Sequence, residues 1–140
     1  MVKIDDYKLL MLLRQNARIS YSELARIFNV SDTAIRKRIK KLEEKGVIKR
    51  YTVEIDPKKI GFDIVALIGI DTKPEYFLSV LDKLKRSKKT MSLYSASGDH
   101  MILVECWFRN SSELTSFVDW IKGLEGVTRI CPAIILEKIK

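Results

Sequence analysis

Hydrophobic residues in the first 50 positions recur at helical spacing in three short segments. These segments are residues 5–16, 20–28 and 30–46. In the last of them, Ile35, Ile39 and Leu42 occupy positions i, i+4 and i+7, so they share one helix face. Each segment has one apolar face, which a single helix cannot bury alone. The pattern therefore predicts three helices that pack around a common core.

Polar residues at the ends of these segments predict where the helices begin and end. Ser20 is followed three residues later by Glu23, which is the spacing of a capping box. Ser31 can cap the third helix, and Gly46 can end it. The connection NVS between the second and third helices has the short length found in helix-turn-helix motifs. An extended run follows over residues 47–55.

The rest of the chain alternates between strand and helix patterns. Pro57 and Gly61 interrupt both periodicities, which indicates a linker over residues 56–63. Beyond it we predict strand, helix, strand, strand, helix and strand over residues 64–71, 74–87, 90–97, 100–108, 110–126 and 127–140. This βαββαβ order is typical of a ferredoxin-like domain, so the chain belongs to the α+β class. The expected divisions are a helix-turn-helix domain over 1–50, a strand and hinge linker over 51–63, and a ferredoxin-like domain over 64–140.

The two helices of the second domain can cover only one face of its four-stranded sheet. An open apolar face of that size usually marks a partner, and a second copy of the chain is the simplest one. The residues of the third predicted strand that contribute to it are either Ile102, Val104 and Cys106 or the alternate set Leu103, Glu105 and Trp107. Because Glu105 is the outlier of the second set, we expect the first set to be the more buried.

The excess of positive charge is confined to the first third of the chain. Residues 1–50 hold 13 Lys and Arg against 6 Asp and Glu, whereas residues 51–140 contribute only +1 of the total net charge of +8. This asymmetry indicates that the N-terminal part binds an anionic polymer. A solvated basic helix face is the alternative. The cations of the third helix and the short connection before it together favour double-stranded DNA.

The candidate base contacts lie on the third helix. With its apolar stripe turned inward, Thr33, Lys37 and Lys40 project on the opposite side. Arg36 lies to one side of them. Because a recognition helix presents its N-terminal half to the major groove, we expect Thr33, Arg36 and Lys37 to meet base edges.

The candidate phosphate contacts are one lysine and three serines. Lys41 offers a point charge beyond the base-contacting residues. Ser20, Ser22 and Ser31 lie at helix N-termini, where backbone amides favour phosphate. Arg38 lies nearer the core flank, so we expect it to pack or to bind phosphate.

The sequence lacks the patterns of catalytic and metal sites. Cys106, Cys131 and the single His100 cannot form a Cys2His2 zinc site, and we expect both thiols to be reduced and buried. His100 beside Asp99 could pair a base with its orienting acid, but a turn histidine is the simpler interpretation. No GxGxxG, HExxH or Ser/His/Asp order occurs. We therefore expect neither enzyme activity nor a cofactor.

Other classes of protein share parts of this pattern. RNA-recognition modules have the same βαββαβ order, but the third predicted strand lacks their base-stacking aromatic pattern. An architectural, weakly specific DNA-binding protein remains an alternative. No apolar run approaches the roughly 18 residues that a membrane helix needs, and no secretory hydrophobic region precedes the first acidic residues. We therefore expect a cytoplasmic protein without a membrane partner.

Long stretches of the chain resemble a known family of transcription regulators. ISYSELARIFNVSDTAIRKRIKKLEEKGVIKRYTVEIDPKKIGF is similar to the N-terminal part of the Lrp/AsnC (feast/famine) regulators. SLYSASGDHMILVECW followed by LEGVTRICPAIIL resembles their C-terminal ligand-sensing domain, called RAM. The resemblance implies a winged helix-turn-helix joined by a hinge to an αβ-sandwich domain that binds an effector and forms oligomers. It also implies dimers that associate into octamers, amino-acid sensing, and control of amino-acid or energy metabolism genes.

The resemblance also implies where an effector binds. The matching positions are Ser97, Gly98, Asp99, His100 and Met101 in one turn, and Ala133, Ile134 and Ile135 near the C-terminus. Gly98 leaves backbone amides open to a carboxylate, and Asp99 can meet an ammonium group. A plain hairpin turn is the alternative. Members that bind amino acids carry an acidic residue at the position of Met101 and a Thr at that of Pro132. The apolar residues here predict either an effector with a hydrophobic side chain or a site that stays empty.

Overall fold

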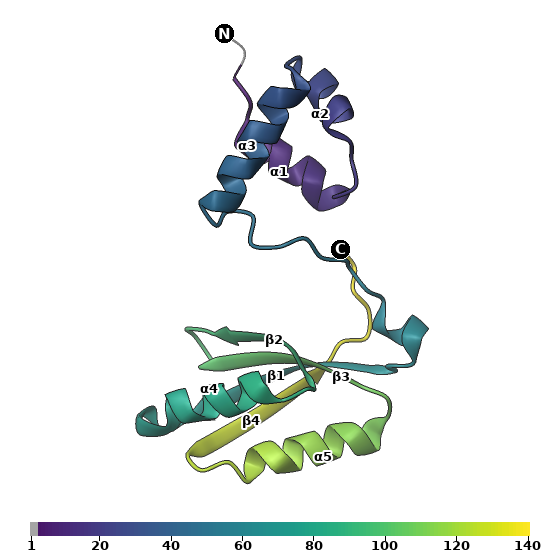
Figure 1. Ribbon diagram of the computed structural model, residues 1–140. Helices are drawn as coiled ribbons and strands as arrows, with labels where there is room; N and C mark the ends of the chain where they lie inside the picture. Colours follow the sequence, from purple (N-terminus) through teal and green to yellow (C-terminus); the bar gives the residue numbers. More distant parts are fainter. Residues whose placement is uncertain (1–2) are drawn as a thin grey trace. The chain divides into compact units, whose positions relative to one another are not determined.

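The computed structural model describes residues 3–140, which form two compact units (Figure 1). The division falls between Glu54 and Ile55, within the linker predicted over 51–63. Met1 and Val2, which the predicted N-terminal domain includes, lie outside the described residues. No helix within residues 3–140 is long and apolar enough to cross a membrane.

The N-terminal unit contains the three predicted helices. They are α1 (Asp6–Gln15), α2 (Tyr21–Phe28) and α3 (Asp32–Glu44). The unit has its own core, in which Leu9, Leu24 and Ile35 are fully buried. Ile39 and Leu42 lie in the same core, so the apolar stripe predicted for the third helix is confirmed. Burying these side chains against one another stabilises helices that are too short to be stable alone.

The predicted helix ends are also confirmed. The Ser20 hydroxyl accepts the Glu23 backbone N–H at 3.0 Å, and the Ser31 hydroxyl accepts the Ala34 N–H at 3.1 Å. Gly46 has a φ of 73°, a left-handed conformation that glycine adopts without a steric penalty. These contacts satisfy backbone groups that would otherwise lack partners at the helix termini.

The extended run predicted over residues 47–55 forms no strand in the single chain. Residues 49–56 have no regular secondary structure, and Tyr51, Val53 and Ile55 expose their side chains. An isolated strand cannot satisfy its backbone hydrogen bonds, so extended propensity alone does not produce a strand. A short 3-10 helix, η1 (Pro57–Ile60), follows within the predicted linker over 56–63.

The C-terminal unit is an antiparallel sheet covered on one face by two helices, as Figure 1 shows. Its elements are β1 (Ile64–Thr72), η2 (Pro74–Tyr76), α4 (Phe77–Arg86), β2 (Thr90–Ser95), β3 (Ile102–Phe108), α5 (Ser111–Lys122) and β4 (Val127–Ile134). The strand order is β2-β3-β1-β4. This is the ferredoxin-like βαββαβ topology that the element order predicted.

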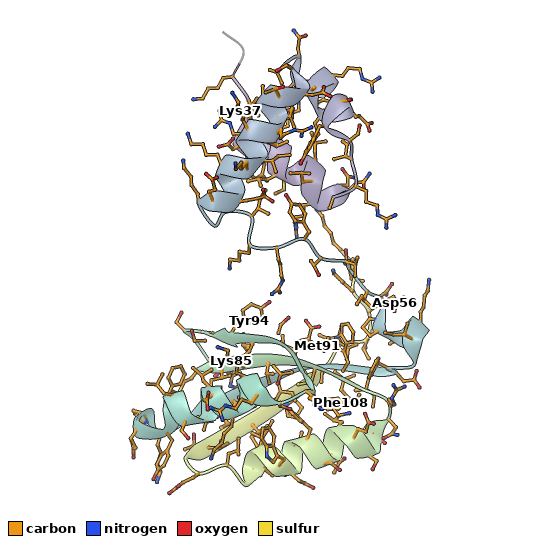
Figure 2. All side chains as sticks on the ribbon, viewed as in Figure 1. Lys37, Asp56, Lys85, Met91, Tyr94 and Phe108 are labelled. Atoms are coloured by element: carbon orange, nitrogen blue, oxygen red, sulfur yellow. The ribbon has the colours of Figure 1, made fainter. Side chains whose placement is uncertain are left out.

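Alternation along the central strands separates the two faces of the sheet. Ile102, Val104 and Cys106 are fully buried, which confirms that they form the more buried set. They belong to the core beneath α4 and α5, together with β1 residues such as Ile68. In Figure 2, Phe108 lies between the sheet and α5, whereas Tyr94 lies on the opposite side of the sheet.

The open face is therefore built from the alternate residues of each strand. Its members from β1 and β3 are Val65, Leu67, Gly69, Asp71, Leu103, Glu105 and Trp107. Glu105, the polar outlier of this set, has a partner on the same face, because the Trp107 indole N–H donates to the Glu105 carboxylate at 2.8 Å. The open face thus carries apolar side chains on either side of Glu105, which lies opposite Leu67, and it is polar at the end that holds Asp71.

The last strand ends earlier than expected. The strand pattern extends over residues 127–140, but β4 stops at Ile134 and lies at the sheet edge. Pro132, which pairs with Ile68, is tolerated there because an edge strand needs only one ladder of hydrogen bonds. Beyond Ile135, whose N–H donates to the Val65 carbonyl at 2.8 Å, the chain no longer pairs with β1.

Candidate nucleic-acid interface and polar cluster on the sheet

The outward face of α3 carries polar and cationic side chains. Thr33, Arg36, Lys37, Lys40 and Lys41 are all exposed, on the sides of the helix away from its buried stripe (Lys37 is labelled in Figure 2). The structure therefore brings the predicted base contacts to one accessible surface. This surface of α3 can present several cations to a polyanion without burying an unpaired charge.

Arg38, by contrast, is turned toward α1. Its guanidinium lies 3.4 Å from the Asp6 carboxylate, and its side chain is 30% exposed. This position agrees with the expectation that Arg38 lies at the core flank. The ion pair links the first and third helices of the unit.

The three candidate serines all make contacts within the protein. Ser20 and Ser31 cap their helices through their hydroxyl oxygens, which leaves each O–H group able to donate. The Ser22 hydroxyl instead donates to the Asp32 carboxylate at 2.8 Å. That bond connects the first turn of α2 to the first turn of α3, a contact that sequence spacing did not reveal.

A second missed contact lies beside it. The guanidinium of Arg36 lies over the ring of Tyr21, 5.2 Å from its centroid. Tyr21 is the first residue of α2, and its ring is partly exposed. The only sequence signal for this pair was an aromatic residue next to a capping serine, followed by a helix with two arginines.

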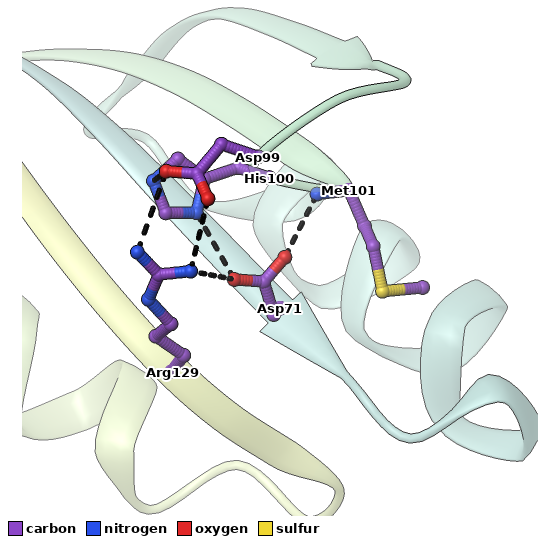
Figure 3. Close-up of polar contacts among 5 residues, drawn as sticks. All are labelled: Asp71, Asp99, His100, Met101 and Arg129. Carbon is purple, nitrogen blue, oxygen red and sulfur yellow. Dashed lines mark hydrogen bonds and ion pairs between the residues drawn. The ribbon is translucent and has the colours of Figure 1, made fainter.

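On the C-terminal unit, the predicted effector turn belongs to a polar cluster (Figure 3). Asp71, near the end of β1, accepts the Met101 backbone N–H at 2.9 Å through one carboxylate oxygen. Its other oxygen lies 3.0 Å from His100 Nδ1. Asp71 and His100 are both largely buried, with about a sixth of each side chain exposed, at 17% and 16%. The loop between β2 and β3 is thus fixed to β1 by a carboxylate.

Asp99 is paired within the chain. Arg129 on β4 donates to its two carboxylate oxygens at 3.2 and 3.3 Å, in the fork geometry that a guanidinium favours. His100 Nε2 lies 3.4 Å from the same carboxylate, and Arg129 also lies 3.9 Å from Asp71. The negative charge of Asp99 is therefore already balanced by Arg129.

The pKa values of this cluster follow from its geometry. Burial by itself raises the pKa of Asp71, but its hydrogen bonds with His100 and Met101 and its electrostatic interactions with His100 and Arg129 lower the pKa overall. The pKa of Arg129 is raised, chiefly by its hydrogen bonds to Asp99. Both shifts favour the charged forms, so Asp71 is a carboxylate and Arg129 a guanidinium at neutral pH.

The His100 ring packs directly against the backbone of Gly69. A Cβ atom added at Gly69 would lie 2.3 Å from the imidazole Cδ2, so the ring occupies the space that any other residue would fill. Because Asp71 holds the ring by its Nδ1 atom, the ring cannot move away freely. Sequence reasoning treated this glycine as an ordinary strand residue and missed both Asp71 and Arg129.

The structure does not bring the two predicted groups of effector residues together within one chain. The turn 97–101 is attached to β1 at Asp71, whereas Ile135 is attached to β1 at Val65. These two points are six residues apart along β1, which corresponds to about 20 Å. Ala133 and Ile134 are exposed at the far end. A single site formed by both groups would therefore need residues from two copies of the chain.

The two cysteines differ in their surroundings. Cys106 is fully buried, as expected, and burial raises the pKa of its thiol to about 12. Cys131 is only partly buried, which corrects the expectation that both thiols lie in the core. Among residues 3–140, no group of three His, Cys, Asp or Glu side chains is arranged to hold a metal ion.

Comparisons with known proteins match both units. Residues 6–49 match a family model described as a winged helix-turn-helix DNA-binding domain, and residues 65–140 match the Lrp/AsnC ligand-binding domain. The HTH-type transcriptional regulator LrpA of Pyrococcus abyssi is 44% identical over 141 residues, covering 100% of both chains. LrpA1 of Halobacterium salinarum is 33% identical, covering 95% of this chain and 94% of its own.

A solved structure agrees with these matches. AsnC of E. coli has a TM-score of 0.84 at 28% identity, with 99% of this chain and 95% of that chain covered. The resemblance seen in the sequence is therefore confirmed over both units, and the relatives are transcription regulators rather than enzymes. The chain belongs to the Lrp/AsnC family of DNA-binding transcription regulators.

Proposed function

We propose that this regulator recognises a specific DNA sequence by inserting α3 into the major groove of the duplex. The observation that carries the proposal is the exposed cationic face of α3 opposite its buried apolar stripe. In this arrangement Thr33, Arg36 and Lys37 contact base edges. The excess charge of +7 in residues 1–50 supplies the sequence-independent part of the affinity.

Contacts to phosphate position the helix in the groove. Lys40 and Lys41 follow the base-contacting residues along α3, and the hydroxyls of Ser20 and Ser31 retain a hydrogen that can be donated to a phosphate oxygen. Ser22 would contact phosphate only through a bridging water that donates to its hydroxyl oxygen, because its hydrogen is used for Asp32.

The test is DNA binding by the full chain, with its own promoter competing against random duplex DNA. We expect a preferred site, and affinity that falls with salt by about 0.9 log units per log unit of salt for each neutralised phosphate. Arg36→Ala should relax the preference at one base position, whereas Lys41→Ala should weaken all sequences alike. Equal affinity for the promoter and random DNA would instead favour an architectural, weakly specific protein.

We further propose that the open sheet face forms a homodimer, which can assemble into larger oligomers such as an octamer. Its partly buried apolar residues Val65, Leu67, Leu103 and Trp107 support this proposal, because contact with a second copy would remove them from water. A two-fold dimer would match a pseudo-palindromic DNA site. Light scattering should show Leu103→Lys shifted toward monomer, with Leu78→Lys on the exposed side of α4 as the control. A wild-type monomer at micromolar concentration would contradict the proposal.

An amino-acid effector with a hydrophobic side chain is proposed for the turn Ser97–Met101. Its ammonium group would contact Asp99 in competition with Arg129, and its side chain would face Met101. Ala133, Ile134 and Ile135 would come from another copy of the chain. Calorimetric titration of the twenty amino acids, with DNA affinity measured in parallel, tests this. Binding that persists unchanged in Asp99→Ala, with Asp119→Ala as the control, would show that the site lies elsewhere.

A further inference from the structure

The first turn of α2 touches two successive turns of α3. Ser22 donates to the Asp32 carboxylate at 2.8 Å, and the ring of Tyr21 lies under the guanidinium of Arg36 at 5.2 Å. Asp32 and Arg36 are four residues apart, so they lie on the same side of α3. Two neighbouring residues of α2, Tyr21 and Ser22, thus contact the same side of α3.

A contact with the Tyr21 ring restricts the Arg36 side chain and uses none of the hydrogen-bond acceptors that its guanidinium would meet in DNA. When a guanidinium stacks on an aromatic ring, it uses its flat face for the contact and keeps its N–H donors in its own plane. Those donors are the atoms that contact O6 and N7 of a guanine in the major groove. A restricted arginine also loses less rotamer freedom when it binds.

From this geometry we infer that Tyr21 is a positioning residue for base recognition, holding Arg36 in the orientation in which it contacts a guanine. The inference rests on the proposed sequence-specific function. It assigns part of the specificity to α2, although only α3 enters the groove. The ring is the active part, and the hydroxyl is not required.

Two simpler roles for Tyr21 make different predictions. A hydroxyl contact with phosphate would be lost in Tyr21→Phe, and that loss would weaken binding to every sequence alike. A role only in folding would lower stability and leave discrimination between bases unchanged. Because Tyr21 is 39% exposed and outside the buried core of the unit, its replacement should leave the fold intact.

The experiment first uses the full chain and a randomised DNA library to find the preferred site. The Arg36→Ala variant then identifies the base pair at which that preference is lost. Affinities for the site and its single-base variants are then measured for Tyr21→Phe, Tyr21→Leu and the double variant Tyr21→Leu/Arg36→Ala. Tyr7→Leu, another exposed tyrosine of the same unit, is the matched control. Circular dichroism checks that each variant is folded.

We expect Tyr21→Phe and Tyr7→Leu to discriminate between the preferred site and its single-base variants as well as wild type does. Tyr21→Leu should lose about two- to fivefold of the discrimination at the Arg36 position only. The double variant should be no worse there than Arg36→Ala, because both changes remove the same contact. Discrimination retained by Tyr21→Leu, or a uniform loss in Tyr21→Phe, would overturn the inference alone. A wild-type chain without any base preference would overturn the proposed function as well.

Discussion

His100 and Asp71, 29 residues apart in sequence, are joined by a contact of 3.0 Å between the imidazole Nδ1 and a carboxylate oxygen. This contact holds the imidazole over Gly69, at the polar end of the open sheet face. The same carboxylate binds the backbone of Met101, so one side chain fixes both the ring and the turn that carries it.

The contact makes Gly69 sensitive to any added atom. We expect Gly69→Ala to lower the free energy of unfolding by about 1–3 kcal/mol, because the new methyl group would overlap a ring that Asp71 holds in place. Urea denaturation measures the change. Adding His100→Ala should restore part of the loss. Gly123→Ala is the control, since the nearest atom to its Cβ lies at an ordinary 3.5 Å. Equal stability of Gly69→Ala and wild type would contradict the prediction.

Asp71 should make the stability of the protein depend on acid pH. Its pKa lies below the usual 3.8 in the folded chain, so the folded state binds fewer protons than the unfolded state. The ionised carboxylate therefore stabilises the fold at pH values above 3.8, the pKa of the unfolded chain. This contribution is lost as the pH falls from 3.8 through the lower pKa of the folded chain. Denaturation at pH 5 and pH 3 should show that the free energy of unfolding falls less between these two pH values for Asp71→Asn than for wild type. The exposed Asp119→Asn should behave like wild type, and parallel curves for all three would refute this role.

The buried thiol should be unreactive. With a pKa of about 12, the Cys106 thiolate fraction at pH 8 is about one in ten thousand, and the side chain has no access to solvent. In a Cys131→Ser variant, we expect no labelling by a thiol reagent in the native state and one thiol per chain in denaturant. Rapid native labelling would show that the core beneath α4 and α5 opens readily.

The cap of α3 can be tested separately from DNA binding. Ser31→Ala removes the acceptor of the Ala34 N–H and should lower the free energy of unfolding by about 1 kcal/mol. Ser31→Asp retains an acceptor and adds a favourable charge at the helix N-terminus, so it should be close to wild type. Thermal unfolding of both variants without DNA provides the measurement. Loss of stability in Ser31→Asp as large as in Ser31→Ala would argue against the cap.

The order and limits of most elements could be predicted from the sequence because their causes are local. Ser20 and Ser31 bind backbone amides only three residues away, and the stripe of Ile35, Ile39 and Leu42 needs only helical periodicity to form. Alternation along the 102–108 run was likewise enough to identify Ile102, Val104 and Cys106 as the more buried set. Extended propensity at residues 47–55 was not enough, because a strand also needs a neighbouring strand.

The contacts of the candidate sites were decided by tertiary structure. Asp99 meets Arg129 only because the β2–β3 turn and β4 lie beside the same end of β1. Arg36 meets Tyr21 only because α2 and α3 pack with their first turns together. A sequence shows which residue types are available, but their partners depend on strand register and helix packing, which are set by the burial of the whole core.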